Sequence, residues 1–158
     1  IEQIDLIKNL AQRYPDVLTL AKNKDEAEEI FAHNRTIASF MGIEGGHVIQ
    51  NNLEYLRTLF NLGCRYMSLT HTCSLDWAES ERNPNPNIDG LSDFGVEVIY
   101  QMNSLGMLVD LSHTSERTMN RVLDVTLAPV IFSHSNAKTL CNHTRNVPDS
   151  ILLKLKHD

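Results

Sequence analysis

Four side chains that can bind a metal ion each follow an apolar segment of the sequence. Glu44 follows FMGI, and His71 follows MSLT. His113 follows VDLS, and His134 follows VIFS. The intervals between them bracket the roughly 30 residues of one strand–helix unit. We therefore expect the four side chains to stand at the ends of successive strands.

The chemistry that these residue types support is metal-assisted hydrolysis. Neutral imidazole nitrogens and carboxylate oxygens are good zinc ligands, and zinc with an open coordination position lowers the pKa of bound water to about 7. Gly45 and Gly46 leave the turn after Glu44 without side chains, so the backbone can approach a ligand closely. A lone histidine at a strand end is more often structural, but four candidates at successive strand ends favour a metal site.

Apolar periodicity predicts that strands and helices alternate along the chain. The predicted strands are 17–20, 36–43, 65–70, 107–111 and 130–133. The predicted helices are 1–13, 24–34, 50–61, 93–104, 115–124 and one that starts near 149. Ser92 and Ser115 suit the first ends of helices, where a side-chain oxygen accepts a free backbone N–H. Gly63 and Gly106 suit helix C-termini.

This alternation predicts an α/β fold of the TIM-like (β/α)8 barrel type. Strands that are apolar along most of their length are typical of parallel sheets covered on both faces. A barrel brings the C-terminal ends of its strands to one mouth, and an open doubly wound sheet would do so less well. Residues 72–90 carry prolines and asparagines without an apolar period, which predicts a long loop at that mouth.

Size and charge narrow the classes further. A complete barrel needs about 250 residues, so we expect residues 1–158 to form one domain holding half to two-thirds of a barrel. The formal net charge is -6 without a basic cluster, whereas a duplex nucleic-acid binder normally has a basic face. No apolar run in the sequence approaches the roughly 20 residues that cross a bilayer.

Six blocks of sequence resemble, in order, those of the membrane (renal) dipeptidase family, zinc metallopeptidases of the amidohydrolase superfamily. The blocks are GIEGGH (42–47), LGCRYMSLTHTC (62–73), GLSDFG (90–95), LGMLVDLSHTS (105–115), APVIFSHSNA (128–137) and RNVPD (145–149). The resemblance is strongest over 36–155. It implies a barrel of the metal-dependent hydrolase type and hydrolysis of the peptide bond of dipeptides through a metal-bound hydroxide.

The resemblance also implies roles for particular residues. In a site with two Zn2+ ions, Glu44 would bridge the metals, and His113 and His134 would bind one of them. His71 would contact the substrate and polarise the scissile carbonyl, and Arg145 would bind the substrate carboxylate with its planar guanidinium. Asp110 is either an orienting group for a ligand or a carboxylate of the barrel wall.

The sequence departs from the family in two places. The His-x-Asp pair that completes the second metal site is missing, because His33 and His47 have no Asp two residues later, and a downstream proton-shuttling Asp has no counterpart. We therefore expect a central fragment of a longer protein, inactive alone. His47 and His143 are expected to be exposed or structural, and Trp77 to pack within the loop.

Alternatives remain open at this point. The same metal site would support hydrolysis of lactams or esters, and a barrel that has lost ligands would be an inactive binding domain. A homodimer is open, as is a membrane anchor outside this segment. The family resemblance implies an extracellular or membrane-anchored location, and a cytoplasmic one stays open.

Overall fold

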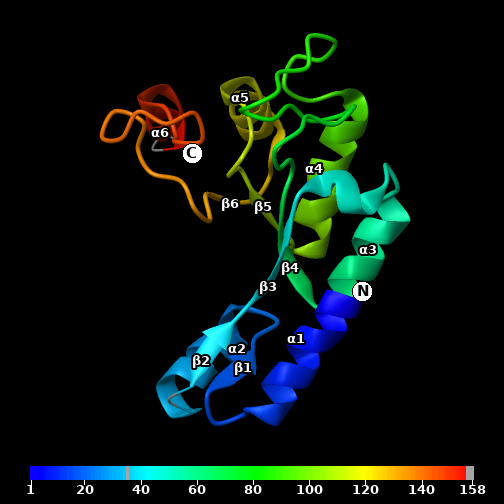
Figure 1. Cartoon of the computed structure of the whole chain (residues 1–158), viewed down its shortest axis with the longest axis vertical. Helices are drawn as coiled ribbons and strands as arrows, with labels where there is room; N and C mark the ends of the chain where they lie inside the picture. The colour runs from blue at the N-terminus through cyan, green and yellow to red at the C-terminus, as the bar shows by residue number, and fades with distance from the viewer. Residues whose placement is uncertain (35, 156–158) are drawn as a thin grey trace.

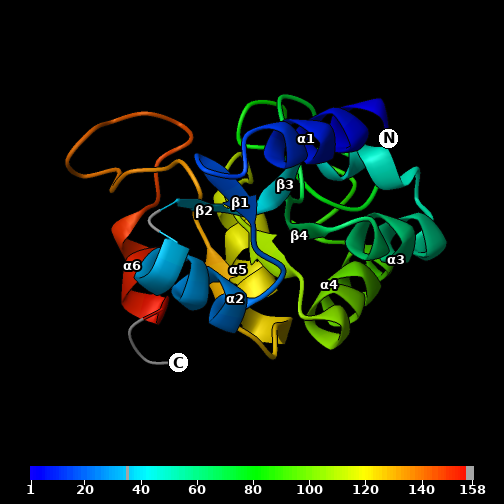
Figure 2. The same cartoon turned by 90° about the horizontal axis from the view of Figure 1, so that it is seen from below.

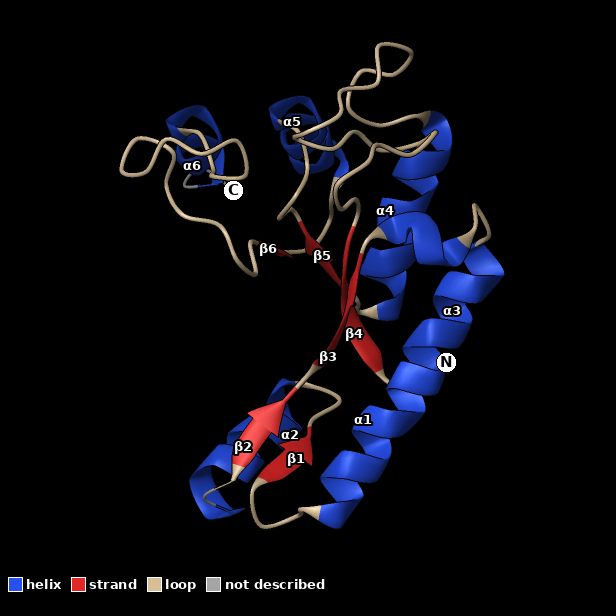
Figure 3. Ribbon diagram, viewed as in Figure 1, coloured by secondary structure: helices blue, strands red, loops and turns tan. Residues whose placement is uncertain are grey.

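The computed structural model describes residues 1–34 and 36–155. Helices and strands alternate along most of the chain (Figures 1 and 3). The helices are α1 (Glu2–Arg13), α2 (Lys24–Glu29), α3 (Leu53–Asn61), α4 (Asp93–Leu105), α5 (Glu116–Val125) and α6 (Asp149–Leu155), with a π-helical turn η1 (Ile30–Asn34) and a 3-10 turn η2 (Gly46–Ile49). The strands are β1 (Leu18–Leu20), β2 (Ile37–Ser39), β3 (Met41–Glu44), β4 (Cys64–Ser68), β5 (Leu108–Asp110) and β6 (Val130–Ile131).

The strands pair in parallel and in chain order. β1 pairs with β2, and a second sheet has the order β3-β4-β5-β6. The single strand predicted over 36–43 is wrong, because Phe40 divides it into β2 and β3, which belong to different sheets. The register shifts between Met41 and Gly42, where the ring of Tyr66 occupies the space that a Cβ on Gly42 would need. The predicted α/β class with parallel strands is confirmed.

Most of the predicted helices are present, with altered ends. The helix predicted over 50–61 begins instead at Leu53, after η2, and Asn52 caps it by accepting from Glu54 N at 2.7 Å. The helix predicted over 24–34 consists of α2 followed by η1. Ser92 and Ser115 cap α4 and α5 as predicted. No helix in the described part of the chain is both long and apolar enough to cross a membrane.

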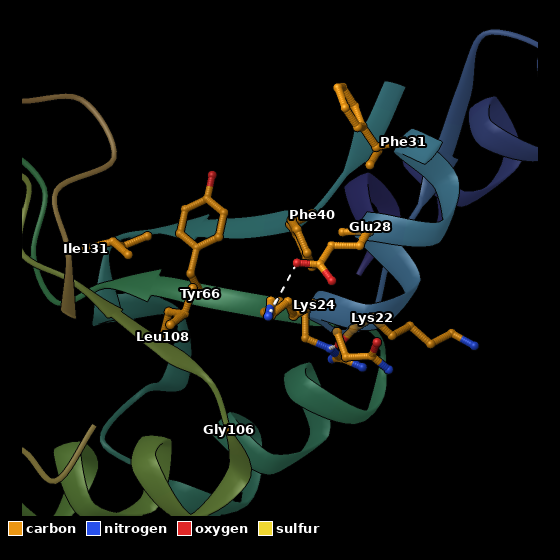
Figure 4. A pocket seen from close by; sticks show the side chains of 13 residues that line it. Lys22, Lys24, Glu28, Phe31, Phe40, Tyr66, Gly106, Leu108 and Ile131 are labelled. Atoms are coloured by element: carbon orange, nitrogen blue, oxygen red, sulfur yellow. Dashed lines mark hydrogen bonds and ion pairs between the residues drawn. The ribbon is translucent and has the colours of Figure 1, made fainter. Parts of the chain in front are cut away.

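The two faces of the second sheet have different surroundings. Met67 of β4 and Val109 of β5 are fully buried on the face covered by α3, α4 and α5 (Figure 2). Leu108, one residue earlier than Val109, points the other way and is 40% exposed. With Phe40 and Tyr66 it lines a hollow of about 760 Å³ (Figure 4). In a complete (β/α)8 barrel the corresponding face is filled by packed layers of inward side chains.

Residues 72–90 are not a loosely attached loop, although they contain no helix. Trp77 is 1% exposed and meets the ring of Phe94 edge-on at 6.0 Å between ring centroids. The equally buried Glu79 accepts from Ser115 Oγ at 2.6 Å and from Arg117 Nε at 3.0 Å, both at the start of α5. The loop is therefore tied to α5 by an ion pair between the buried Glu79 and the half-exposed Arg117, and Figure 1 shows the loop and α5 side by side.

The buried loop explains the glycines after Glu44. A Cβ on Gly46 would stand 2.5 Å from the ring of Trp77 and 2.6 Å from the carbonyl oxygen of Leu69. Gly45 has a φ of +107°, which side chains other than hydrogen rarely permit. Trp77 and the end of β4 thus press directly on the turn that carries Glu44, and only glycine fits there.

We predict that Gly46→Ala lowers the free energy of unfolding by about 1–3 kcal/mol, because the added methyl overpacks a buried contact. Urea unfolding of the purified protein measures the change. Gly106→Asn is the matched control, since a Cβ there meets nothing within 4 Å and asparagine tolerates its φ of +74°. The control should change stability by about 0.5 kcal/mol or less. Equal losses in both variants would contradict this account of the turn.

Candidate metal centre

All four candidate side chains at the strand ends converge. The Glu44 carboxylate, at the end of β3, lies between three imidazoles from the segments that follow β4, β5 and β6. Its Oε1 atom is 3.2 Å from His113 Nε2 and 3.3 Å from His134 Nε2. His71 Nε2 is farther, at 3.9 Å. The convergence is that predicted for parallel strands sharing one mouth.

The imidazole rings are also in contact with one another. His113 and His134 have their Nε2 atoms 2.8 Å apart and their ring centroids 4.8 Å apart. The ring of His71 meets that of His113 edge-on at 4.5 Å between centroids. Three basic rings around one carboxylate form a compact set of nitrogen and oxygen donors, open to solvent at Glu44, whose side chain is 56% exposed.

The donor atoms of Glu44, His113 and His134 fit one zinc ion. Ligands at about 2.1 Å around a tetrahedral zinc lie about 3.3 Å apart, and these three atoms are separated by 2.8 to 3.3 Å. Glu44, His71 and His113 form a second possible metal group, in which one ligand atom of each residue lies within 4.8 Å of the others. His71 Nε2 is 3.9 Å from Glu44 Oε1, farther than the Nε2 atoms of His113 and His134.

A buried hydrogen-bond chain sets the direction in which His134 presents its lone pair. Asp110 is 1% exposed and accepts from the backbone N–H groups of Ser112 and Ser133, both at 3.0 Å. Ser133 Oγ donates to Asp110 Oδ2 at 2.5 Å, which leaves its oxygen free to accept from His134 Nδ1 at 2.7 Å. His134 then carries its proton on Nδ1. Its Nε2 atom is unprotonated, and the lone pair of this atom faces Glu44. Asp110 thus orients His134 through Ser133.

His113 is the most constrained of the three histidines. It is 5% exposed and has a φ of +69°, a region that non-glycine residues seldom occupy. Its carbonyl accepts from Thr70 Oγ1 at 2.9 Å and from Glu81 N at 3.1 Å, which holds the backbone in place. Burial lowers the pKa of His113, and only the nearby Glu81 carboxylate opposes this. The lowered pKa favours the neutral imidazole, the form that can bind a metal.

Arg145 lies on the segment that precedes α6, at the edge of this cluster. Its backbone N–H donates to His143 Nδ1 at 3.2 Å, and the residue is partly buried. Its positive charge is close enough to contribute to the lowered pKa of His113. His47 and His143 are exposed, as expected from the sequence.

Two carboxylates near the cluster escaped the sequence reasoning. Glu79 and Glu81 lie in the stretch 72–90, whose composition indicated only a loop, yet their side chains are 1% and 3% exposed. A glutamate with no apolar period around it gives no sign of burial in the sequence. The WAES tetrapeptide (77–80), with an aromatic residue and alanine beside the acid, was the one available signal.

A carboxylate ringed by imidazoles at the C-terminal ends of parallel strands defines the class: part of a βα barrel of the metal-dependent hydrolase type. The sequence profile of the membrane dipeptidase family, peptidase family M19, matches residues 1–158. The chain belongs to this family.

Individual relatives agree with this assignment. An uncharacterized dipeptidase of Schizosaccharomyces pombe is 46% identical over 158 residues, 99% of this chain and 38% of that protein. An amidohydrolase structure from Pseudomonas aeruginosa has a TM-score of 0.88 at 22% identity, over 99% of this chain and 47% of that one. A metallopeptidase from Rhodobacter sphaeroides, liganded with a phosphinate mimic of the dipeptide L-Ala-D-Ala, has a TM-score of 0.75 at 23% identity, covering 89% and 41%. At these identities the two structures show the fold, and the chain spans less than half of each relative.

We predict that Asp110→Asn in the complete protein lowers zinc affinity by about 10–100-fold. The amide NH2 would face Ser133 Oγ, so the serine proton would turn to His134 Nδ1 and the histidine proton would move to Nε2, the atom that would otherwise bind the metal. Competition with a chromophoric chelator measures the affinity. Asp124→Asn is the control, because this exposed aspartate contacts Lys154 far from the histidines. Unchanged affinity in Asp110→Asn would refute the orienting chain.

Proposed function

We propose that the protein to which this chain contributes is a zinc-dependent dipeptidase. The observation that carries the proposal is the convergence of Glu44, His113 and His134, with donor atoms within 3.3 Å of one another. Membership of the membrane dipeptidase family supports it. So does the dipeptide mimic bound by the related Rhodobacter sphaeroides enzyme.

In this proposal His113 and His134 hold one zinc ion, and Glu44 stands between it and a second. Zinc supplies a Lewis acid and a hydroxide nucleophile near neutral pH. Among Glu44, His113 and His134, Glu44 has the most exposed side chain. Its carboxylate therefore faces the space that a substrate would enter. The chain of this fragment provides the ligands of one metal, and the remaining ligands are expected from outside residues 1–158.

His71 is suited to act on the substrate. Its side chain is 46% exposed, and its Nε2 atom lies on the same side as the metal ligands. Thr72 Oγ1 is 3.2 Å from His71 Nδ1. If the threonine hydroxyl donates this bond, Nε2 carries the proton and can donate to the carbonyl oxygen of the scissile peptide, which polarises it.

Arg145 is proposed to bind the C-terminal carboxylate of the dipeptide. Its guanidinium can make two parallel hydrogen bonds to a carboxylate, which fixes both position and orientation. Such a contact would favour dipeptides, whose carboxylate lies one residue from the scissile bond. It also separates peptide hydrolysis from lactam or ester hydrolysis, which needs the same metals and no such grip. A homodimer and an anchor outside this segment are further expectations from the family.

We predict that the complete protein cleaves a panel of dipeptides, and that removal of zinc by a chelator abolishes the activity. Arg145→Met should lower kcat/KM for dipeptides by about 100-fold, because the substrate carboxylate loses its partner, with bound zinc unchanged. Arg121→Met is the matched control, since that side chain is exposed on α5. Dipeptide amides, which lack the carboxylate, should not distinguish Arg145→Met from wild type.

Two outcomes would contradict this assignment. Zinc-loaded protein without any dipeptide cleavage would return the choice to another amidohydrolase reaction or to a binding domain. Full dipeptide turnover by Arg145→Met would remove the carboxylate grip and favour lactam or ester substrates.

A further inference from the structure

Glu81 lies in the loop 72–90, with its side chain 3% exposed and turned toward His113. Its Oε1 atom is 3.6 Å from His113 Nδ1, just beyond hydrogen-bond distance. Within residues 1–34 and 36–155, neither of these two buried atoms has a hydrogen-bond partner. A buried carboxylate oxygen and a buried ring nitrogen therefore face each other, and neither has a hydrogen bond to another group.

We propose that Glu81 is a positioning residue that receives a hydrogen bond from Nδ1–H of His113. The bond would fix the His113 proton on Nδ1. Nε2 would then be unprotonated, with its lone pair facing Glu44 and His134 and free to bind a metal. A metal on Nε2 makes Nδ1–H a stronger donor, so a shift of a few tenths of an ångström would complete the contact.

The backbone already places Glu81 for this role. Glu81 N donates to the carbonyl oxygen of His113 at 3.1 Å, so the two residues are joined at the main chain. The preceding Ser80 forms a β-bridge with Thr114, the residue after His113. Two successive loop residues are thus fastened to the segment that carries His113.

The other polar neighbours of Glu81 leave its inward oxygen available. Ser80 Oγ lies 3.1 Å from Oε2, the outer oxygen. Arg82 Nε is 3.5 Å from Oε1, but the Arg82 side chain is 52% exposed and compensates the charge from the solvent side. The Glu81 charge is therefore balanced, while Oε1 still lacks the short hydrogen bond that a buried carboxylate oxygen normally has.

The two histidine ligands then have equivalent support. His134 Nδ1 reaches the buried Asp110 through Ser133 Oγ. His113 Nδ1 faces the buried Glu81 directly. In both cases a carboxylate stands behind Nδ1 and Nε2 points to the cluster, an arrangement that raises the basicity of metal-binding imidazoles.

The neighbouring Glu79 shows what a purely structural glutamate does in the same loop. It is 1% exposed, and it receives hydrogen bonds from Ser115 Oγ, Arg117 Nε and Asn85 N. None of these partners is a histidine, and both of its oxygens are occupied. Glu79 therefore matches Glu81 in burial and charge. It differs in its partner, because Glu79 binds the start of α5 and Glu81 faces His113.

The inference rests on the proposed metal site, so its test has two readouts in the complete protein. Zinc affinity is measured by competition with a chromophoric chelator, and the His113 tautomer is read from imidazole 15N shifts of the metal-free protein. For Glu81→Ala we expect about 10–100-fold weaker zinc binding and loss of the Nδ1–H form of His113. Glu81→Gln should lie between, because its carbonyl oxygen still accepts. Glu79→Gln should lose stability and change neither readout.

The outcomes separate this inference from the proposed function. If wild type binds zinc and Glu81→Ala binds it equally, with an unchanged His113 tautomer, Glu81 has no positioning role and the dipeptidase proposal stands. If wild type binds no zinc, the proposed function fails, and the tautomer of the metal-free protein still decides whether Glu81 holds His113. If Glu81→Ala fails to fold, Glu81→Gln tests the same positioning role. In that variant the zinc affinity and the population of the Nδ1–H form of His113 should both fall, by less than expected for Glu81→Ala.

Discussion

The structure depends on one electrostatic constraint: the Glu44 carboxylate must be held among three imidazoles at the ends of neighbouring parallel strands. Imidazole rings and a carboxylate at 3.2 to 3.9 Å make a weak cluster by themselves, and a cation held by Glu44, His113 and His134 would stabilise it. The parallel register provides the first requirement, because Glu44, Ser68 and Asp110 are aligned across β3, β4 and β5.

The supports of this cluster come from behind the sheet ends. Trp77 packs against the turn after Glu44, and Glu79 fastens the same loop to the start of α5. Asp110 and Glu81 stand behind the Nδ1 atoms of His134 and His113. The loop 72–90 therefore supports the turn after Glu44 through Trp77 and lies against His113 through Glu81, whereas His134 is supported by Asp110 through Ser133.

The sequence predicted the parts that depend on local rules. The caps at Ser92 and Ser115 and the convergence of Glu44 with the histidines follow from periodicity and from the shared direction of parallel strands. The strands predicted over 65–70 and 130–133 end earlier, at Ser68 and Ile131. The break at Phe40 was missed because the apolar pattern of 36–43 continues through it, whereas the sheet that each half joins depends on pairing with strands distant in sequence. The burial of Glu81 was missed because it too depends on a neighbour distant in sequence, His113. The roles of His71 and Arg145 toward a substrate remain predictions.

The central claim is that Glu44, His113 and His134 hold a metal in the complete protein. The most direct measurement is zinc per chain by elemental analysis, on wild type and on His134→Ala, after dialysis against metal-free buffer. The account predicts about two zinc ions per wild-type chain, as the family resemblance implies, and about one in His134→Ala with the fold retained by circular dichroism. No zinc in wild type, or an equal amount in both proteins, would contradict it.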